Sequence, residues 1–386
     1  MRVLLLSDVY FPRINGVSTS IQTLRRELLA AGHEVTLVAP DYARSTPESG
    51  VLRVRGWSLP FDPEDRLMHW RELNAALEGL PAPFDVVHVH TPFLAHYAGL
   101  RYARRHGTPL VETYHTLFTE YFHHYLPILP RAWLKALARA ISRRQCNEVD
   151  AVIAPSGPMR EALLEYGVTT RIEVIPTGLL PESFVPGNGA GFRHAHGLPP
   201  DRPLLLFVGR VAFEKNIGFL LDMLVALRRT HPEACLVIAG EGPAERELHR
   251  EVRRLGLTDS VRFVGYLDRQ RELPDCYRAA DVFVFASRTE TQGLVLLEAM
   301  AQGTPVVALA EMGTRDVLSE GEGCRIAPPD PAAFARIVAE LLDDAEAHRR
   351  LAAAALAYAQ AWRAERMVER VAALYAELAA SAPQTG

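Results

Sequence analysis

One stretch of the sequence, residues 281–308, constrains the fold more than any other. A continuous apolar run over 282–286 predicts a buried strand, polar residues over 287–292 predict a loop, and 294–301 predicts a helix. Gly303 marks the end of that helix, and a second apolar run follows it. A strand, a loop, a helix and a second strand in this order indicate an α/β fold with a parallel sheet.

Two carboxylates flank the start of this predicted helix. Glu290 lies in the loop beyond the carboxyl end of the strand, and Glu298 lies about one turn inside the helix. Between them, Gly293 lets a ligand approach the backbone closely, and the free N–H groups at a helix start suit a phosphate. One carboxylate can accept hydrogen bonds from sugar hydroxyls and the other from a ribose. The pattern predicts a nucleotide-sugar site.

Composition restricts the remaining possibilities. A length of 386 residues predicts two or three domains, and a net charge of −4 gives no indication of nucleic-acid binding. The apolar run within residues 1–7 is too short for a signal peptide or a membrane helix, so it predicts a first buried strand. The cysteines lack Cys-x-x-Cys spacing, which argues against zinc and disulfides and favours a reducing cytosol; they are Cys146, Cys235, Cys276 and Cys324.

Two series of strands alternate with helical stretches. Apolar runs predict strands at 2–6, 34–39, 51–54, 86–90, 110–113 and 151–154, and again at 204–208, 236–239, 261–266 and 282–286. The stretch 181–203 is rich in proline and glycine and predicts an interdomain linker. We therefore expect a first domain over 1–183, a second over 184–364, and a final helical segment over 365–386.

The loop after the predicted strand 204–208 carries two cations. Arg210 and Lys215 lie at a carboxyl strand end, where they can neutralise a diphosphate leaving group. Lys215 is one of only two lysines in a chain that otherwise uses arginine. In the first series, Asn15 and Gly16 stand where a Rossmann fold places its phosphate turn, but no G-x-G-x-x-G occurs there, which argues against a dinucleotide-dependent dehydrogenase.

Three histidines follow strand ends in the first half. His88 and His90 share one face of a strand end. A metal pair is conceivable, but no third ligand is nearby in the sequence, and a structural or acceptor-side role is favoured. His115 follows the next strand, at the edge where open α/β sheets place ligands.

A basic region lies between residues 101 and 144. It holds eight arginine or lysine residues against two glutamates, a local net charge of +6. The predicted helix over 131–144 combines a basic stripe with an apolar one, and an aromatic and aliphatic stretch over 118–129 precedes it. The stripes are Arg131, Lys135, Arg139 and Arg143, and Trp133, Leu134, Leu137 and Ile141. The combination favours contact with an anionic membrane through residues 118–144; an ordinary helix with a solvated face remains the alternative.

These motifs together resemble the retaining GT-B glycosyltransferases of family 4. The resemblance rests on Glu290 and Glu298 with Gly293 between them, on the Gly-Thr-Pro-Val-Val run that starts at Gly303, and on the loop 209–216. Residues 289–298 are especially similar to bacterial diacylglycerol glucosyltransferases and their mannosyl relatives. The resemblance implies an α/β protein of two Rossmann-like domains with parallel sheets facing across a deep cleft, with the last helix crossing back to the first domain.

The resemblance also implies residue roles. Glu290 and the N–H groups of Gly293 and Leu294 are expected to hold the sugar, and Glu298 the ribose. Arg210 and Lys215 are expected to stabilise the leaving diphosphate, and His115 to contact the sugar from the acceptor side. The expected catalytic residues are His115, Arg210, Lys215 and Glu290, and the expected donor-binding residues are Gly16, Arg210, Lys215, Tyr266, Gln292, Gly293, Leu294 and Glu298. Because no Asp-x-Asp signature is evident, no obligatory metal is expected.

The predicted activity is transfer of a hexosyl group, with retention, from a nucleotide-diphosphate sugar to a membrane lipid such as diacylglycerol. UDP-glucose is favoured over a GDP-sugar as the donor. Two alternatives stay open: a GDP-mannose-dependent α-mannosyltransferase acting on a phosphoinositide or glycan, and an epimerase-like protein that binds nucleotide sugars without transfer. The predicted location is the cytoplasm, peripheral on the inner face of the plasma membrane, with no nucleic-acid partner.

Overall fold

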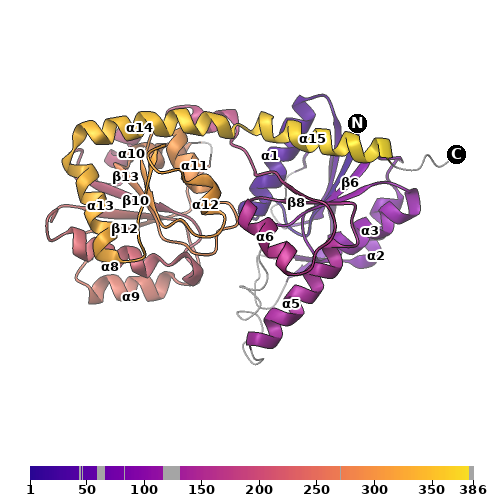
Figure 1. The fold of residues 1–386 in the computed structure, drawn as a ribbon, viewed down its shortest axis with the longest axis horizontal. Coiled ribbons are helices and arrows are strands. Elements are labelled where there is room, and N and C mark those ends of the chain that lie inside the picture. Colours follow the sequence, from indigo (N-terminus) through magenta and orange to yellow (C-terminus); the bar gives the residue numbers. More distant parts are fainter. Residues whose placement is uncertain are drawn as a thin grey trace. The chain divides into compact units, whose positions relative to one another are not determined.

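The chain forms two compact units (Figure 1). The computed structural model describes residues 1–42, 45, 47–58, 66–81, 83–115, 131–269 and 271–381, apart from the side chains of residues 131 and 132. Unit 1 combines Met1–Gly178 with Ala364–Gly386, and unit 2 is Leu179–Arg363. The chain passes between the units at 178/179 and 363/364. The predicted domain boundaries, 183/184 and 364/365, stay a prediction.

Seven parallel strands form one sheet in the described part of unit 1, in the order β3-β2-β1-β6-β7-β8-β9. They are β1 (Arg2–Leu6), β2 (Glu34–Pro40), β3 (Val51–Val54), β6 (Val86–Val89), β7 (Leu110–Thr113), β8 (Ala151–Ala154) and β9 (Ile172–Val174). The register pairs Val3 with Val35 on one side and with Val86 on the other. A short antiparallel pair, β4 (Gly56–Ser58) and β5 (Arg66–Met68), lies outside this sheet.

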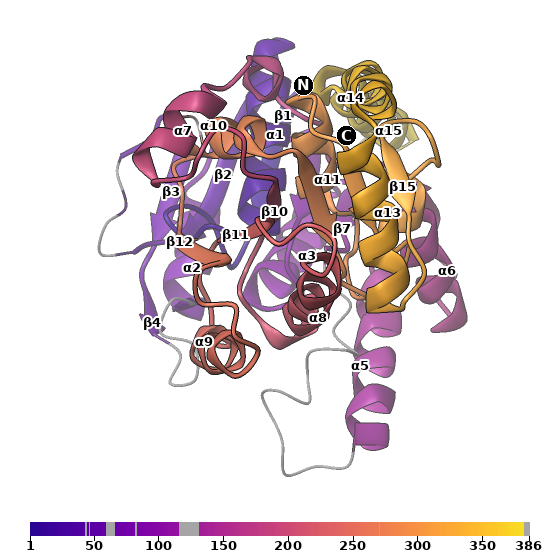
Figure 2. The same ribbon diagram turned by 90° about the vertical axis from the view of Figure 1, so that its left-hand side faces the viewer.

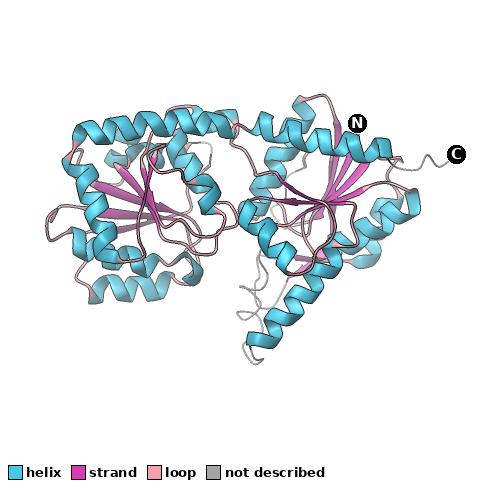
Figure 3. Ribbon diagram, in the orientation of Figure 1, coloured by secondary structure: helices cyan, strands magenta, loops and turns pink. Residues whose placement is uncertain are grey.

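Helices cover both faces of the sheet of unit 1 (Figure 3). They are α1 (Gly16–Ala30), α2 (Trp70–Glu78), α3 (Leu94–His106), α5 (Arg131–Cys146), α6 (Gly157–Glu165) and α15 (Ala364–Ser381). Asn15 begins α1, because its side chain accepts a hydrogen bond from the Ser18 N–H at 2.8 Å. The helices α1 and α15 share one apolar core with the strands, in which Ile21 and Val371 pack over Val3 and Val86.

Unit 2 repeats the parallel α/β plan. Its described strands follow the order β12-β11-β10-β13-β14-β15. The strands are β10 (Leu204–Val208), β11 (Cys235–Ala239), β12 (Val261–Gly265), β13 (Val282–Phe285), β14 (Val306–Ala308) and β15 (Cys324–Ile326). The predicted α/β class with parallel sheets is therefore confirmed for both units.

The helices of unit 2 also lie on both faces of its sheet, and α8 and α13 pack side by side (Figure 2). They are α7 (Gly189–Ala195), α8 (Ile217–Leu227), α9 (Glu245–Arg254), α10 (Glu272–Ala279), α11 (Leu294–Ala301), α12 (Thr314–Val317), α13 (Pro331–Asp343) and α14 (Ala345–Ala359). The described residues of this unit also form short 3-10 helices, namely η1 (Pro181–Phe184), η2 (Phe213–Lys215) and η3 (Gln360–Trp362).

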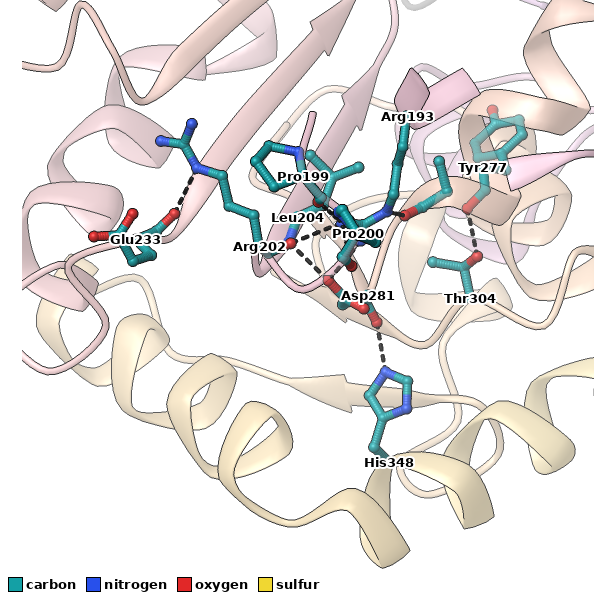
Figure 4. Close-up of polar contacts among 11 residues, drawn as sticks. Arg193, Pro199, Pro200, Arg202, Leu204, Glu233, Tyr277, Asp281, Thr304 and His348 are labelled. Carbon is teal, nitrogen blue, oxygen red and sulfur yellow. Dashed lines mark hydrogen bonds and ion pairs between the residues drawn. The ribbon is translucent and has the colours of Figure 1, made fainter. Parts of the chain in front are cut away.

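The stretch predicted as an interdomain linker, 181–203, is instead an integral part of unit 2. Arg193 of α7 donates hydrogen bonds to the carbonyls of Pro199, Pro200, Arg202 and Ala279, and pairs with the Asp281 carboxylate at 3.0 Å (Figure 4). Because one buried guanidinium satisfies several carbonyls of the proline-rich segment, this segment is fixed to the start of β13. The linker prediction was wrong for these residues.

Candidate functional site

The sheet of unit 2 places two loops at its switch point. β10 pairs with β13 on one side and with β11 on the other, so the strand order reverses between β10 and β13. In open α/β sheets, ligands bind outside the carboxyl ends of the strands at such a point. The loop after β10 carries Arg210 and Lys215, and the loop after β13 carries Glu290.

Lys215 and Glu290 are in direct contact. The Lys215 ammonium donates a hydrogen bond to Glu290 Oε1, and the two side chains are only 14% and 19% exposed. Asn216, in the left-handed region with φ of 55°, donates from its side chain to the Ala286 carbonyl at 3.2 Å. This bond ties the two loops together, so the cation and the carboxylate meet at a fixed place. Arg210 lies in the same loop with an exposed side chain.

Gly293 shapes the start of α11. Its φ of 92° lies in the left-handed region, and no side chain caps this helix start. A Cβ at this position would lie 3.1 Å from Leu296 and 3.2 Å from Thr314. The loop before it is fixed from the other side, because the Gly313 N–H donates to the Glu290 carbonyl at 2.9 Å. Of the neighbouring predicted residues, Gln292 is buried and Leu294 is partly buried.

Glu298 lies one turn inside α11, and both of its oxygens have partners within unit 2. Oε2 accepts a hydrogen bond from the Tyr277 hydroxyl at 2.7 Å, and Oε1 accepts one from the Arg269 guanidinium. The negative charge of Glu298 raises the pKa of Arg269. Arg269 and Tyr277 were not among the predicted site residues, and the predicted contact of Glu298 with a ribose stays a prediction.

The remaining predicted site residue of unit 2 is Tyr266. It directly follows β12, two strands away from β10 in the sheet, and is 47% exposed. Since all strands of this sheet are parallel, Tyr266 lies on the same carboxyl edge as Lys215 and Glu290. Its predicted contact with the base stays a prediction.

Gly16 and His115 belong to unit 1. Gly16 is the first residue of α1, and a Cβ there would meet no atom within 4 Å. His115 follows β7, and its Nε2 lies 3.1 Å from Nδ1 of His90. The roles predicted for these two residues stay predictions.

The histidines of unit 1 form a buried cluster. His88 Nδ1 lies 2.5 Å from the Tyr375 hydroxyl and Nε2 lies 2.7 Å from the Thr113 hydroxyl. Burial lowers the pKa of His88 to about 3 and that of His115 to about 4, and it holds the pKa of His90 well below its usual value. The three imidazoles are therefore neutral at neutral pH. His88, with both ring nitrogens bonded inside the core, matches the structural role favoured from the sequence.

The predicted apolar stripe of α5 is partly buried and partly exposed. Leu134 is buried and Ile141 is partly buried, whereas Trp133 is 75% and Leu137 52% exposed. The Arg139 guanidinium lies 5.3 Å from the centre of the Tyr166 ring. Figures 1 and 2 show that α5 extends away from the sheet of unit 1. The aromatic stretch 118–129 and the Arg131 side chain lie outside the described residues.

The described residues contain neither a membrane-spanning helix nor a cluster of metal ligands. In the part of the chain that the structure describes, every helix is too short or too polar to span a bilayer. Among those same residues, no three His, Cys, Asp or Glu side chains are grouped as a metal site would need. The four cysteines are buried and free.

Comparison with known proteins gives a consistent result. Residues 14–182 match the family model described as Glycosyltransferase Family 4, and residues 191–357 match the one described as Glycosyl transferases group 1. The alpha-monoglucosyldiacylglycerol synthase of Streptococcus pneumoniae is 33% identical over 83% of this chain and 74% of that protein. The GDP-mannose-dependent alpha-(1-6)-phosphatidylinositol dimannoside mannosyltransferase of Mycobacterium tuberculosis is 29% identical over 94% of this chain and 93% of that protein.

The solved structures show the same fold. The sucrose-phosphate synthase of Thermosynechococcus elongatus superposes with a TM-score of 0.80 at 25% identity, over 99% of this chain and 100% of that one.

Proposed function

This chain belongs to the group 1, family 4 glycosyltransferases, and from that premise we propose that it transfers a hexosyl group, with retention, to a membrane lipid. The membership makes it a transferase that uses a nucleotide-sugar donor. The observation that carries the proposal is the contact between Lys215 and Glu290 at the switch point of unit 2. A cation and a carboxylate fixed there suit the two halves of one donor, the diphosphate and the sugar.

In the proposed reaction, the bond between the anomeric carbon and the diphosphate oxygen breaks while the acceptor oxygen bonds to the same face of that carbon. The largest charge develops on the departing diphosphate, so Arg210 and Lys215 stabilise it as preorganised cations. The proton of the acceptor hydroxyl passes to the diphosphate. No obligatory metal takes part in this proposal, and full activity in excess EDTA is the expected result.

The other proposed contacts orient the donor. Glu290 and the N–H groups of Gly293 and Leu294 hold the sugar, and Glu298 accepts from the ribose. Lys215 bonds to Glu290. A diphosphate at Lys215 would replace one anion by another and leave a Glu290 oxygen for sugar hydroxyls. Gln292, Tyr266 and Gly16 complete the donor site, and His115 contacts the sugar from the acceptor side.

UDP-glucose and diacylglycerol are the proposed substrates. The streptococcal relative is named as an alpha-monoglucosyldiacylglycerol synthase, which supports glucose as the sugar and diacylglycerol as the acceptor. The mycobacterial relative is named for GDP-mannose and a phosphatidylinositol dimannoside, which makes a GDP-mannose-dependent mannosyltransferase the second candidate.

A donor screen separates these candidates. Purified protein is incubated with UDP-glucose, UDP-galactose or GDP-mannose and a total lipid extract, and the lipids are analysed by mass spectrometry. A new hexosyl-diacylglycerol formed from UDP-glucose alone is the expected result. Mannolipid from GDP-mannose supports the second candidate. A new nucleotide-sugar epimer without any glycolipid contradicts transfer and favours an epimerase-like activity.

We place membrane contact on α5, as part of residues 118–144, which makes the protein peripheral on the inner face of the plasma membrane. Trp133 and Leu137 offer exposed apolar area, and Lys135, Arg139 and Arg143 offer positive charge on the same helix. An apolar side chain that is mostly exposed gains free energy when it enters the bilayer interface.

Liposome flotation tests this contact. A variant with Arg131, Lys135, Arg139 and Arg143 changed to Gln is compared with one that loses four arginines of α9, namely Arg246, Arg250, Arg253 and Arg254. Binding to anionic vesicles is expected to fall only in the α5 variant. Equal loss in both variants, or none in either, contradicts the assignment to α5.

A further inference from the structure

The environment of Glu298 identifies two residues with a task in the nucleotide site. The Glu298 side chain is only 9% exposed, although it carries a carboxylate. The Tyr277 hydroxyl on one side and the Arg269 guanidinium on the other each donate to a different oxygen. A buried carboxylate with one donor on each oxygen is held in a single orientation.

Tyr277 is itself fixed by its surroundings. It is 2% exposed, and its ring lies against Phe283 of β13 with the ring centres 5.7 Å apart. Its carbonyl accepts a hydrogen bond from the Thr304 hydroxyl at 2.7 Å (Figure 4). The packing therefore holds the Tyr277 side chain in one position in α10, from which its hydroxyl donates to Glu298.

The chemistry of this arrangement suits recognition of hydroxyl groups. Burial disfavours the charged form of a carboxyl, whereas hydrogen bonds donated to its oxygens favour that form. Each carboxylate oxygen has two lone pairs, so the bonds from Tyr277 and Arg269 leave one acceptor position on each oxygen. Burial and the charge of Glu298 raise the pKa of Tyr277, so its hydroxyl stays a donor throughout the physiological range.

We propose that Tyr277 is a positioning residue that holds Glu298 as an oriented carboxylate for the vicinal hydroxyls of a ribose, with Arg269 as its counter-ion. The inference rests on the proposed function, because it assumes that Glu298 contacts the nucleoside. It adds that discrimination between ribose and a sugar lacking these hydroxyls depends on a tyrosine that touches no substrate.

The test compares nucleotides with and without these hydroxyls. Affinities of UDP, 2′,3′-dideoxy-UDP and inorganic pyrophosphate are measured by calorimetry on wild type and Tyr277→Phe, with the GDP pair in parallel. The wild type is expected to prefer the ribonucleotide, and Tyr277→Phe is expected to reduce this preference about tenfold, since one hydrogen bond to a charged group is lost. Pyrophosphate binding is expected to be unchanged.

The pair of nucleotides also separates positioning from mere structural support. In Tyr277→Phe the affinity for the ribonucleotide is expected to fall while the affinity for the dideoxynucleotide keeps its wild-type value, whereas a structural defect would lower both. Arg269→Gln, which alters a partly exposed side chain, is a second variant with the same expected pattern should Tyr277→Phe fail to fold. Tyr375→Phe removes an equally buried hydroxyl from unit 1 and is expected to leave both affinities unchanged.

The possible failures are distinguishable. If Glu298→Gln reduces the ribose preference while Tyr277→Phe and Arg269→Gln keep the wild-type ratio of the two affinities, the inference is overturned and the proposed function stands. If wild type binds the ribonucleotide and the dideoxynucleotide equally, both the inference and the ribose role of Glu298 are overturned. Absence of binding to either nucleoside diphosphate contradicts the proposed function itself.

Discussion

The two units each bury a tyrosine hydroxyl against a titratable group, but the groups differ in charge. In unit 1, Tyr375 contacts His88, whose pKa burial lowers to about 3, so the pair is neutral. In unit 2, Tyr277 contacts Glu298, and Arg269 completes an ion pair. These two sites show two ways to place polar atoms in an apolar core: at Tyr375 the partner is a neutral histidine, whereas at Tyr277 the partner is a carboxylate with a counter-ion.

The same contrast extends to the neighbouring groups. Burial also raises the pKa of Asp8 in unit 1 to about 6, towards its neutral form. In unit 2, Lys215 and Glu290 are a second ion pair at the carboxyl edge of the sheet. Retained charge is useful where a charged ligand binds, because a diphosphate needs cations and ribose hydroxyls need a strong acceptor. This difference supports the donor site in unit 2.

Acidification is expected to have the largest effect and to act on unit 1. When the chain is unfolded, His88, His90 and His115 take up a proton near pH 6.5. In the folded protein, burial lowers the pKa of His88 to about 3 and that of His115 to about 4, and it holds the pKa of His90 well below its usual value. Between these values the unfolded state binds more protons, so stability falls as the pH falls. Asp8 acts in the opposite direction between pH 6 and its usual value of 3.8, as one group against three.

The expected net loss in unit 1 between pH 7 and pH 5 is about 4 kcal/mol, at about 1.4 kcal/mol per group and pH unit. Hydrogen exchange at pH 7, 6 and 5 measures it for each unit separately. Unit 2 is the internal control. An equal loss of hydrogen-exchange protection in both units would contradict the difference between them.

Removal of the counter-ion in unit 2 is expected to have the next largest effect. Arg269→Met leaves the Glu298 carboxylate buried without its ion partner, which costs about 2 kcal/mol of unfolding free energy. The value is below that of a fully buried pair because the Arg269 side chain is 32% exposed. Urea unfolding at pH 7 measures the loss. A variant as stable as wild type would show that the ion pair between Arg269 and Glu298 does not stabilise unit 2.

Removal of the unit 1 hydroxyl is expected to have a smaller effect. Tyr375→Phe leaves His88 Nδ1 without its partner, which costs about 1 kcal/mol because both groups are neutral. Thermal unfolding of Tyr375→Phe and Tyr277→Phe, analysed side by side, checks this value. The unit 2 variant is expected to lose more, since its hydroxyl bonds to a charge; the reverse order contradicts the contrast.

The smallest effect is expected from an exposed ion pair. Glu377 of α15 contacts Arg171 at 2.6 Å beside β9, with both side chains open to solvent. Such pairs contribute little, so Glu377→Gln is expected to change the unfolding free energy by less than about 0.5 kcal/mol. A loss of 2 kcal/mol in urea unfolding would show that α15 depends on this contact.

The sequence predicted the strands well because most of them are buried on both faces and form continuous apolar runs. The observed bounds of β1, β7, β8 and β10 equal the predicted ones. The proline-rich segment 181–203 was misassigned because its hydrogen bonds come from Arg193, a contact that composition does not reveal. The short pair β4 and β5 was not predicted either.

Only part of the candidate site could be predicted from the sequence. Lys215 and Glu290 each follow a strand end, so the switch-point rule could bring them together, and the structure places them in contact. Arg269 and Tyr277 precede Glu298 by 29 and 21 residues, and no helical or strand spacing relates them to it. Contacts that depend on the packing of α10 against α11 have no local sequence signal.

The most direct test of the account is transfer of labelled glucose from UDP-glucose to extracted lipid by wild type, Lys215→Ala and Glu290→Gln. The account predicts labelled glycolipid with wild type, a decrease of at least about 100-fold with either variant, and a circular dichroism spectrum that shows the fold retained. Near-wild-type transfer by either variant, with the same fold retained, would contradict the claim that this pair holds the activated sugar.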